Sequence, residues 1–172
     1  MLLLDYANFG RLQAQSIRAT EAFRAEARLF VARIHDLVRA VVPFEPDSNL
    51  VCLAMNPCGN TGLRTMNRFM RRLHHALSAD PDKPLQLGEY FGSITTLKPD
   101  AMGPADTRRL LSELGFAEDA ICEGDEETDR IVILRHTLMN PFLLDDSREV
   151  GYLAGYFDFL GRLIAELLAM ES

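Results

Sequence analysis

The first forty residues carry an apolar stripe at helical spacing. Apolar side chains recur every three or four residues between Tyr6 and Val41, and no proline occurs before Pro43. Such spacing places these side chains on one face of a helix. The pattern predicts one helix over 6–41, about 50 Å long at a rise of ~1.5 Å per residue, with Gly10 as the point where it could break. We expect so long a stripe to be covered by another domain or by a partner subunit.

Three later segments have the character of strands. Residues 49–55 and 130–136 are short, mostly apolar runs, which are typical of strands covered on both faces. Residues 86–97 combine aromatic and β-branched side chains with two glycines, Gly88 and Gly92. This composition predicts a strand pair or one bent strand.

Helical patterns are interleaved with these strands. The first begins at a cap on Asn60 or Thr61 and continues to Leu77, with its buried face at i, i+3 and i+7 positions. A short helix is expected over 106–114. A long amphipathic helix ends the chain, and it begins at a capping-box pattern in residues 146–149.

In this order the elements predict an α+β fold, in which a long N-terminal helix precedes a small, mostly antiparallel sheet with helices packed on it. Two prolines in residues 43–46 end the first helix. We therefore expect a long interdomain helix and linker over 1–45 and a small C-terminal α/β sandwich domain over 46–172. A doubly wound nucleotide-binding fold is not expected, because the chain has neither GxGxxG after a strand nor GxxxxGK[ST].

Composition narrows the kinds of partner. The chain has 172 residues, 48% of them hydrophobic, and its net charge of −7 argues against nucleic acid, whose phosphates require a basic surface. Arg68, Arg71 and Arg72 form a dense basic cluster, which we interpret as the solvated face of a helix. No apolar run approaches the ~20 residues needed to cross a bilayer, so no membrane partner is expected. The three cysteines indicate neither disulfides nor a zinc site, which favours a reducing, cytoplasmic setting.

Histidines and cysteines do not combine into a catalytic or metal-binding set. His74 and His75 are adjacent on a predicted helix and so point about 100° apart. Cys58 lies in a turn with no histidine near it in sequence. The acidic run 123–127 has the character of a solvated loop. We therefore predict no catalytic residue and no metal ligand in this chain.

Arg135 is the residue that the pattern singles out for binding. Four aliphatic residues, 131–134, lead into it, and Asn140 and a proline follow five residues later. The guanidinium keeps its charge at physiological pH, and its planar fork matches a carboxylate or phosphate. Two roles fit it about equally: an anchor for an anionic ligand, or a structural pair with a carboxylate of the acidic loop. His136 should point to the opposite face of the sheet.

The order of these motifs resembles the C-terminal small domain of the pyridoxal-phosphate-dependent amino-acid decarboxylases. This is group II, which includes glutamate, aromatic amino-acid and tyrosine decarboxylases on the aminotransferase-type fold. Four segments carry the resemblance: Asn49-Leu-Val-Cys-Leu, the helix 63–77 with Asn67, Tyr90-Phe-Gly-Ser-Ile-Thr-Thr-Leu97, and Leu134-Arg135-His-Thr-Leu-Met-Asn140-Pro141. The helix before Pro43 is similar to the one that connects the large and small domains in that family.

The resemblance implies a carboxy-lyase of amino-acid metabolism as the parent enzyme, with Arg135 contacting the substrate carboxylate. In that family a large-domain lysine that follows a histidine binds the pyridoxal phosphate. The lysines of this chain are Lys83 and Lys98, and neither follows a histidine. We therefore expect this chain to hold no cofactor and to be inactive alone. It would need the large domain, in a homodimer, and would be a piece of a longer enzyme or the product of a split or truncated gene.

Two alternatives stay open on the sequence. The first is a free-standing, non-enzymatic regulatory or interaction module of ferredoxin-like type that dimerises through its helical arm. The second, weaker alternative is a small anion-binding protein that uses Arg135 alone.

Overall fold

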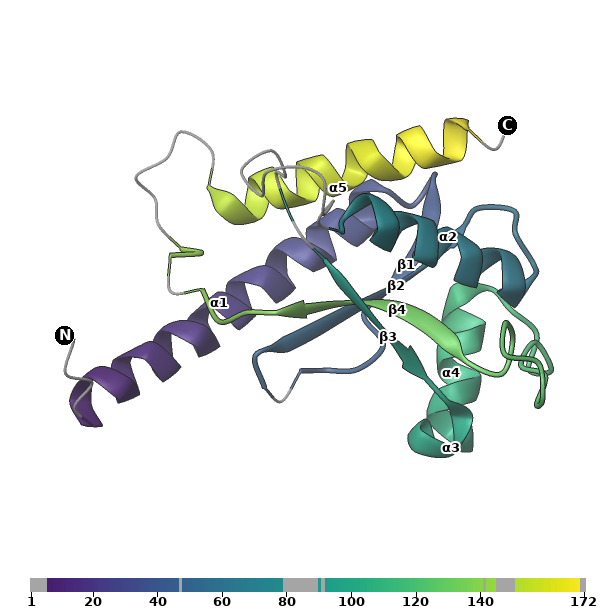
Figure 1. Ribbon diagram of the computed structural model, residues 1–172, viewed down its shortest axis with the longest axis horizontal. Helices are drawn as coiled ribbons and strands as arrows, with labels where there is room; N and C mark the ends of the chain where they lie inside the picture. Colours follow the sequence, from purple (N-terminus) through teal and green to yellow (C-terminus); the bar gives the residue numbers. More distant parts are fainter. Residues whose placement is uncertain are drawn as a thin grey trace.

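The computed structural model describes residues 6–46, 48–78, 90, 92–140, 142–144 and 151–170. Helices and strands alternate along much of this part of the chain (Figure 1). The elements are α1 (Tyr6–Arg33), β1 (Val38–Val41), β2 (Leu50–Pro57), α2 (Leu63–Ala76), β3 (Ser93–Leu97), α3 (Pro99–Met102), α4 (Pro104–Leu114), β4 (Ile131–Thr137) and α5 (Tyr152–Ala169). This composition confirms the predicted α+β class.

The strands of the described residues form one antiparallel sheet in the order β1-β2-β4-β3. In Figure 1, α2 and α5 lie on one side of this sheet, and α3 and α4 lie on the other. α1 packs along α5 and against β2. Because helices contact β2 from both sides, seven of its eight residues are buried, as its continuous apolar run predicts.

The core lies between the sheet and the helices α1, α2 and α5. Phe30 of α1, Phe69 of α2 and Phe157 of α5 are each 1% exposed. The ring centroid of Phe157 lies 5.0 Å from that of Phe30 and 4.9 Å from that of Phe23. Burying one such side chain contributes about 2–3 kcal/mol. Much of the apolar stripe of α1 is therefore covered by β2 and α5 of the same chain.

The first helix is shorter than predicted. It ends at Arg33, and Gly10 does not break it. Residues 38–41, predicted as its last turn, form β1, which pairs antiparallel with β2. The prediction failed because Val38 and Val41 fit the helical spacing of the stripe, whereas β-branched residues also favour extended structure and β2 supplies the backbone partners. Strand β1 thus lies within the segment assigned to the interdomain helix and linker.

Other elements differ from prediction at their ends. α2 has Gly62 at its N-cap, not Asn60 or Thr61, and no side chain caps it. Instead, Asn60 Oδ1 accepts a hydrogen bond from the N–H of Gly62 at 3.1 Å. The unpredicted α3 follows β3 closely, since proline suits the first turn of a helix. Segments 79–89 and 145–150, which include the predicted capping box, lie outside the described residues.

Candidate functional site

Arg135 lies in strand β4, at the edge of a pocket. Residues 131–134 are buried, whereas Arg135 is exposed. In the sheet, Arg135 is paired with Cys52 of β2 on one side and with Ser93 of β3 on the other. Burial raises the pKa of the Cys52 thiol, and the charge of Arg135 opposes this shift. The thiol beside Arg135 is therefore neutral at physiological pH and does not compensate its charge.

The pocket beside Arg135 is open and has a volume of about 550 Å³. It forms where the end of β4, the start of β3, the first turns of α5 and one side chain of α1 meet. It is lined by Phe23, Tyr90, Gly92, Ser93, Arg135, His136, Thr137, Leu138, Asn140, Leu143, Tyr152, Leu153 and Tyr156. Arg135 is the only one of these residues with a permanent charge.

The described part of the chain offers Arg135 a hydroxyl group but no carboxylate. Arg135 Nε donates to Ser93 Oγ at 3.3 Å. The acidic loop instead pairs with α2: Arg64 contacts Asp125 at 2.5 Å and Glu127 at 2.8 Å, and Arg68 contacts Glu127 at 3.1 Å. The alternative in which this loop neutralises Arg135 is therefore wrong. Arg68 is exposed, as expected for the solvated face of a helix, and it forms this ion pair at the surface.

His136 points away from Arg135, as predicted, and forms a polar pair with Tyr156 of α5. Its Nδ1 lies 3.1 Å from the carbonyl oxygen of Val51, and its Nε2 lies 2.5 Å from the Tyr156 hydroxyl. A carbonyl only accepts, so Nδ1 carries the proton and Nε2 accepts from the tyrosine. Burial lowers the pKa of His136 to about 4 and raises that of Tyr156 well above its usual range. Both groups are neutral at physiological pH.

Aromatic rings surround this pair, and the sequence pattern did not assign them to a site. The Tyr156 ring meets His136 edge to face, with centroids 5.4 Å apart, and meets Tyr90 in the same way at 5.3 Å. Phe23 of α1 lies 4.7 Å from His136. One local signal was available, because Tyr152 and Tyr156 are four residues apart and so share a face of α5.

Comparison with known families identifies this fold. Residues 22–158 match the sequence profile of the family described as tyrosine decarboxylase, C-terminal. The chain belongs to this family. The match extends from α1 into α5 and so includes Ser93, Arg135, His136 and Tyr156. It confirms the resemblance to the C-terminal domain of a group II decarboxylase and lends no support to a free-standing module. No curated protein matches the chain.

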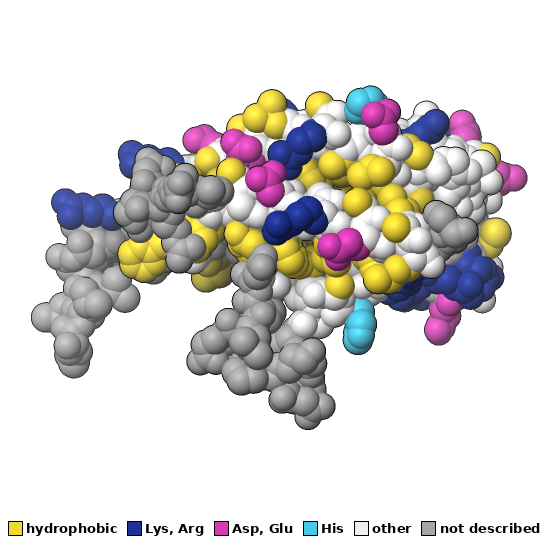
Figure 2. Space-filling model, turned by 90° about the horizontal axis from the view of Figure 1, so that it is seen from above, with side chains coloured by type: hydrophobic (Ala, Val, Ile, Leu, Met, Phe, Trp, Pro, Cys, Tyr) yellow, Lys and Arg dark blue, Asp and Glu magenta, His cyan; other side chains and the backbone are white. Residues whose placement is uncertain are grey.

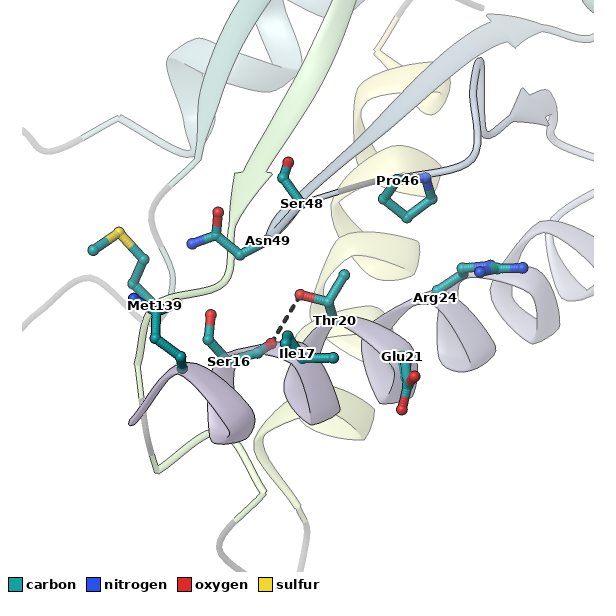
Figure 3. Close-up of a pocket in the computed structure, with 10 residues that line it drawn as sticks. Ser16, Ile17, Thr20, Glu21, Arg24, Pro46, Ser48, Asn49 and Met139 are labelled. Atoms are coloured by element: carbon teal, nitrogen blue, oxygen red, sulfur yellow. Dashed lines mark hydrogen bonds between the residues drawn. The ribbon is translucent and has the colours of Figure 1, made fainter. Parts of the chain in front are cut away.

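A second pocket of this decarboxylase C-terminal domain lies between α1 and the segment that leads into β2 (Figure 3). Its volume is about 700 Å³. Arg24, the one cation among its lining residues, forms an ion pair with Glu45 at 2.7 Å. Thr20 donates to the Ser16 carbonyl at 2.9 Å, and the Ser16 hydroxyl donates to the Leu138 carbonyl at 2.6 Å. The charge of Arg24 is thus compensated by Glu45, so the Arg135 pocket is the better candidate for an anion.

Among the described residues, no lysine lines the Arg135 pocket to attach pyridoxal phosphate covalently. Lys98 is exposed and does not line the pocket, and Lys83 lies outside the described residues. Within the described ranges no group of three His, Cys, Asp or Glu side chains could hold a metal ion. Cys58 is exposed, and its thiol donates to the His35 carbonyl at 3.3 Å. No helix in these ranges is long and apolar enough to cross a membrane.

Proposed function

We propose that this chain is the C-terminal domain of an amino-acid decarboxylase and that Arg135 binds the substrate carboxylate at the entrance of the parent enzyme's active site. One observation carries the proposal: Arg135 is the only permanent charge among the residues that line the pocket. The described residues provide no ion pair that would compensate it. A guanidinium can hold a carboxylate through two parallel N–H···O bonds, which fixes the orientation of the ligand as well as its position.

The walls of the pocket favour a ligand with one anionic end and an aromatic body. Tyr90 and Tyr152 line the same pocket as Arg135, and the largely buried rings of Tyr156 and Phe23 form part of its wall. Aromatic pairs gain about 0.5–1.5 kcal/mol beyond the area that they bury. Since His136 is neutral, the pocket offers no second charge to a second carboxylate. Together with the name of the family, these properties support an aromatic amino acid, with tyrosine as the first candidate.

In the parent enzyme this domain would close the substrate entrance and exclude water, while a large domain supplies the chemistry. Pyridoxal phosphate, when bound to the large domain, supplies the electron sink for loss of carbon dioxide. The division into a connecting segment, 1–45, and a small domain, 46–172, belongs to this proposal, with β1 joining the two parts through its pairing with β2.

The same proposal includes a surface of this chain that packs against the large domain and the second subunit of a homodimer. Seen from the side of α5, Figure 2 shows a band of hydrophobic side chains that single charged residues interrupt. Leu29 is 65% exposed and Met170 is 75% exposed. Large apolar side chains left this accessible suit packing between domains or subunits.

The experiment is a calorimetric titration of this chain with 3-(4-hydroxyphenyl)propionate, which has a carboxylate and a phenol ring but no amine. Arg135→Ala should weaken binding by about 10-fold to 100-fold, the loss expected for a charge-assisted hydrogen-bonded contact of about 1.5–3 kcal/mol. Arg108→Ala is the matched control, because Arg108 is exposed on α4 and does not line the Arg135 pocket. It should bind the probe as the unaltered chain does.

The neutral amide of the same probe tests the role of charge. It should bind at least 10-fold more weakly than the carboxylate to the unaltered chain and equally weakly to Arg135→Ala. Equal affinity of Arg135→Ala and the unaltered chain for the carboxylate would contradict the proposal, as would the absence of any binding.

A further inference from the structure

Ser93 and Arg135 form a reciprocal pair of hydrogen bonds across two strands. The Ser93 hydroxyl donates to the main-chain carbonyl of Arg135 at 3.0 Å and accepts from Arg135 Nε at 3.3 Å. A hydroxyl has one proton to donate and lone pairs to accept, so both bonds can exist together. The same side chain therefore contacts the backbone of Arg135 and the inner nitrogen of its guanidinium.

Backbone packing holds Ser93 at this position. Gly92 precedes it, and the Gly92 N–H donates to the Leu77 carbonyl at the end of α2, at 3.0 Å. A Cβ at Gly92 would lie 3.0 Å from Leu77 Cδ1 and 3.3 Å from Leu134 Cδ1, closer than ordinary van der Waals contact. The glycine lets the chain pass close to the core just before β3. The first residue of β3 is consequently set directly opposite Arg135 in the sheet.

The bond to Nε has a consequence for what the guanidinium can bind. An arginine can bind a carboxylate in two bidentate ways. In the side-on mode it donates through Nε and one terminal nitrogen, and in the end-on mode it donates through both terminal nitrogens. Ser93 Oγ occupies Nε. Within the described part of the chain, the terminal nitrogens of Arg135 have no carboxylate partner, so the end of the fork is the part available to a ligand.

We propose that Ser93 is a positioning residue that holds Arg135 through Nε and thereby makes this domain bind carboxylates end-on. The proposal rests on the proposed function, in which Arg135 is the carboxylate anchor. The part that Ser93 plays is separate, because it concerns the orientation of the anchor and not its charge. Restricting an arginine that has several freely rotating bonds should raise affinity by reducing the entropy lost on binding.

The test compares Ser93→Ala with Ser93→Thr in this chain, with 3-(4-hydroxyphenyl)propionate as the probe. Alanine keeps the strand pairing and removes the hydroxyl, whereas threonine keeps the hydroxyl and suits a strand. Ser93→Ala should weaken binding about fivefold, the equivalent of about 1 kcal/mol, because the guanidinium loses the contact that restrains it through Nε. Ser93→Thr should bind within about twofold of the unaltered chain, because the threonine hydroxyl can form both hydrogen bonds.

Arg135→Lys provides a double-mutant cycle. A lysine keeps the positive charge but has no group equivalent to Nε. Removing the Ser93 hydroxyl in the Arg135→Lys background should therefore leave affinity unchanged. A fivefold loss in that background would overturn the proposal, because Ser93 would then act on the pocket without the guanidinium.

A spectroscopic readout is independent of the ligand. In ¹⁵N spectra of the free chain, hydrogen exchange of the Arg135 Nε–H should be faster in Ser93→Ala than in the unaltered chain, and unchanged in Ser93→Thr. Equal exchange in all three would overturn the proposal. The failures are distinguishable: if Arg135→Ala binds the probe normally, the proposed function fails. If Arg135→Ala loses binding but Ser93→Ala does not, the positioning role alone fails.

Discussion

The neutral histidine at the pocket makes the stability of the domain depend on pH. Burial lowers the pKa of His136 to about 4, whereas an unfolded chain has the ordinary value near 6.5. Between these two values the unfolded state binds a proton that the folded state does not bind. Lowering the pH through this range therefore destabilises the fold, and the contribution of His136 is fully present only above about pH 6.5. From pH 7 to pH 4.5 the loss is about 2 kcal/mol.

His136→Gln removes this titration and keeps the polar contacts. A glutamine amide has a donor for the Val51 carbonyl and an acceptor for the Tyr156 hydroxyl, the two partners of His136. Carboxylates also titrate in this range, so the informative quantity is the difference between the two chains. Between pH 7 and pH 4.5 the variant should lose about 2 kcal/mol less of its free energy of unfolding than the unaltered chain.

The assay is urea unfolding followed by circular dichroism at a series of pH values from 7.5 to about 4.5, with the free energy taken from linear extrapolation. His75→Gln is the matched control, because His75 is exposed on α2. It should reproduce the pH dependence of the unaltered chain. If His136→Gln and the unaltered chain lost the same free energy over this range, the inference that His136 is held neutral would be refuted.

Two further substitutions test how the domain is held together. Asn67→Ala should lower the free energy of unfolding, measured in urea, by about 3 kcal/mol. The buried amide donates to the Glu127 and Arg130 carbonyls and accepts from the Val132 N–H, and each of these groups would lose its partner. A loss under about 1 kcal/mol would contradict this role. Arg64→Ala should cost less than about 1 kcal/mol by the same assay, because its ion pairs are half-exposed and screened by solvent. A larger loss of unfolding free energy that does not change with salt concentration would show that these ion pairs stabilise the domain more than their exposure indicates.

The order of elements could be predicted wherever local pattern and tertiary environment agree. The apolar runs at 49–55 and 130–136 became β2 and β4 because both are covered on two faces. The stripe that ends at Val41 was ambiguous, since the same valines suit the face of a helix and the pleat of a strand. Pairing with β2 decided between the two, and the sequence pattern contains no information on that partner.

The candidate site divides in the same way. Arg135 could be recognised from the sequence because an arginine that directly follows four aliphatic residues is a local signal. It can be seen without knowing which residues contact it in the fold. Ser93 could not be recognised in this way, because its contact with Arg135 spans 42 residues and depends on the register of two strands. Tyr156 was likewise unremarkable beside Phe157 in an amphipathic helix. Its hydrogen bond to His136, across 20 residues, and its ring contact with Tyr90 place it at the pocket.

By itself, the sequence determined the α+β class, the family resemblance and the position of one cation at the end of a buried strand. These follow from periodicity and from the kinds of residue at neighbouring positions, which are local properties. The tertiary structure decided that the acidic loop pairs with α2, that Ser93 holds Arg135, and that burial keeps His136 neutral. Each of these depends on how residues distant in sequence are brought together, because hydrogen bonds and desolvation depend on distances of a few ångströms in space.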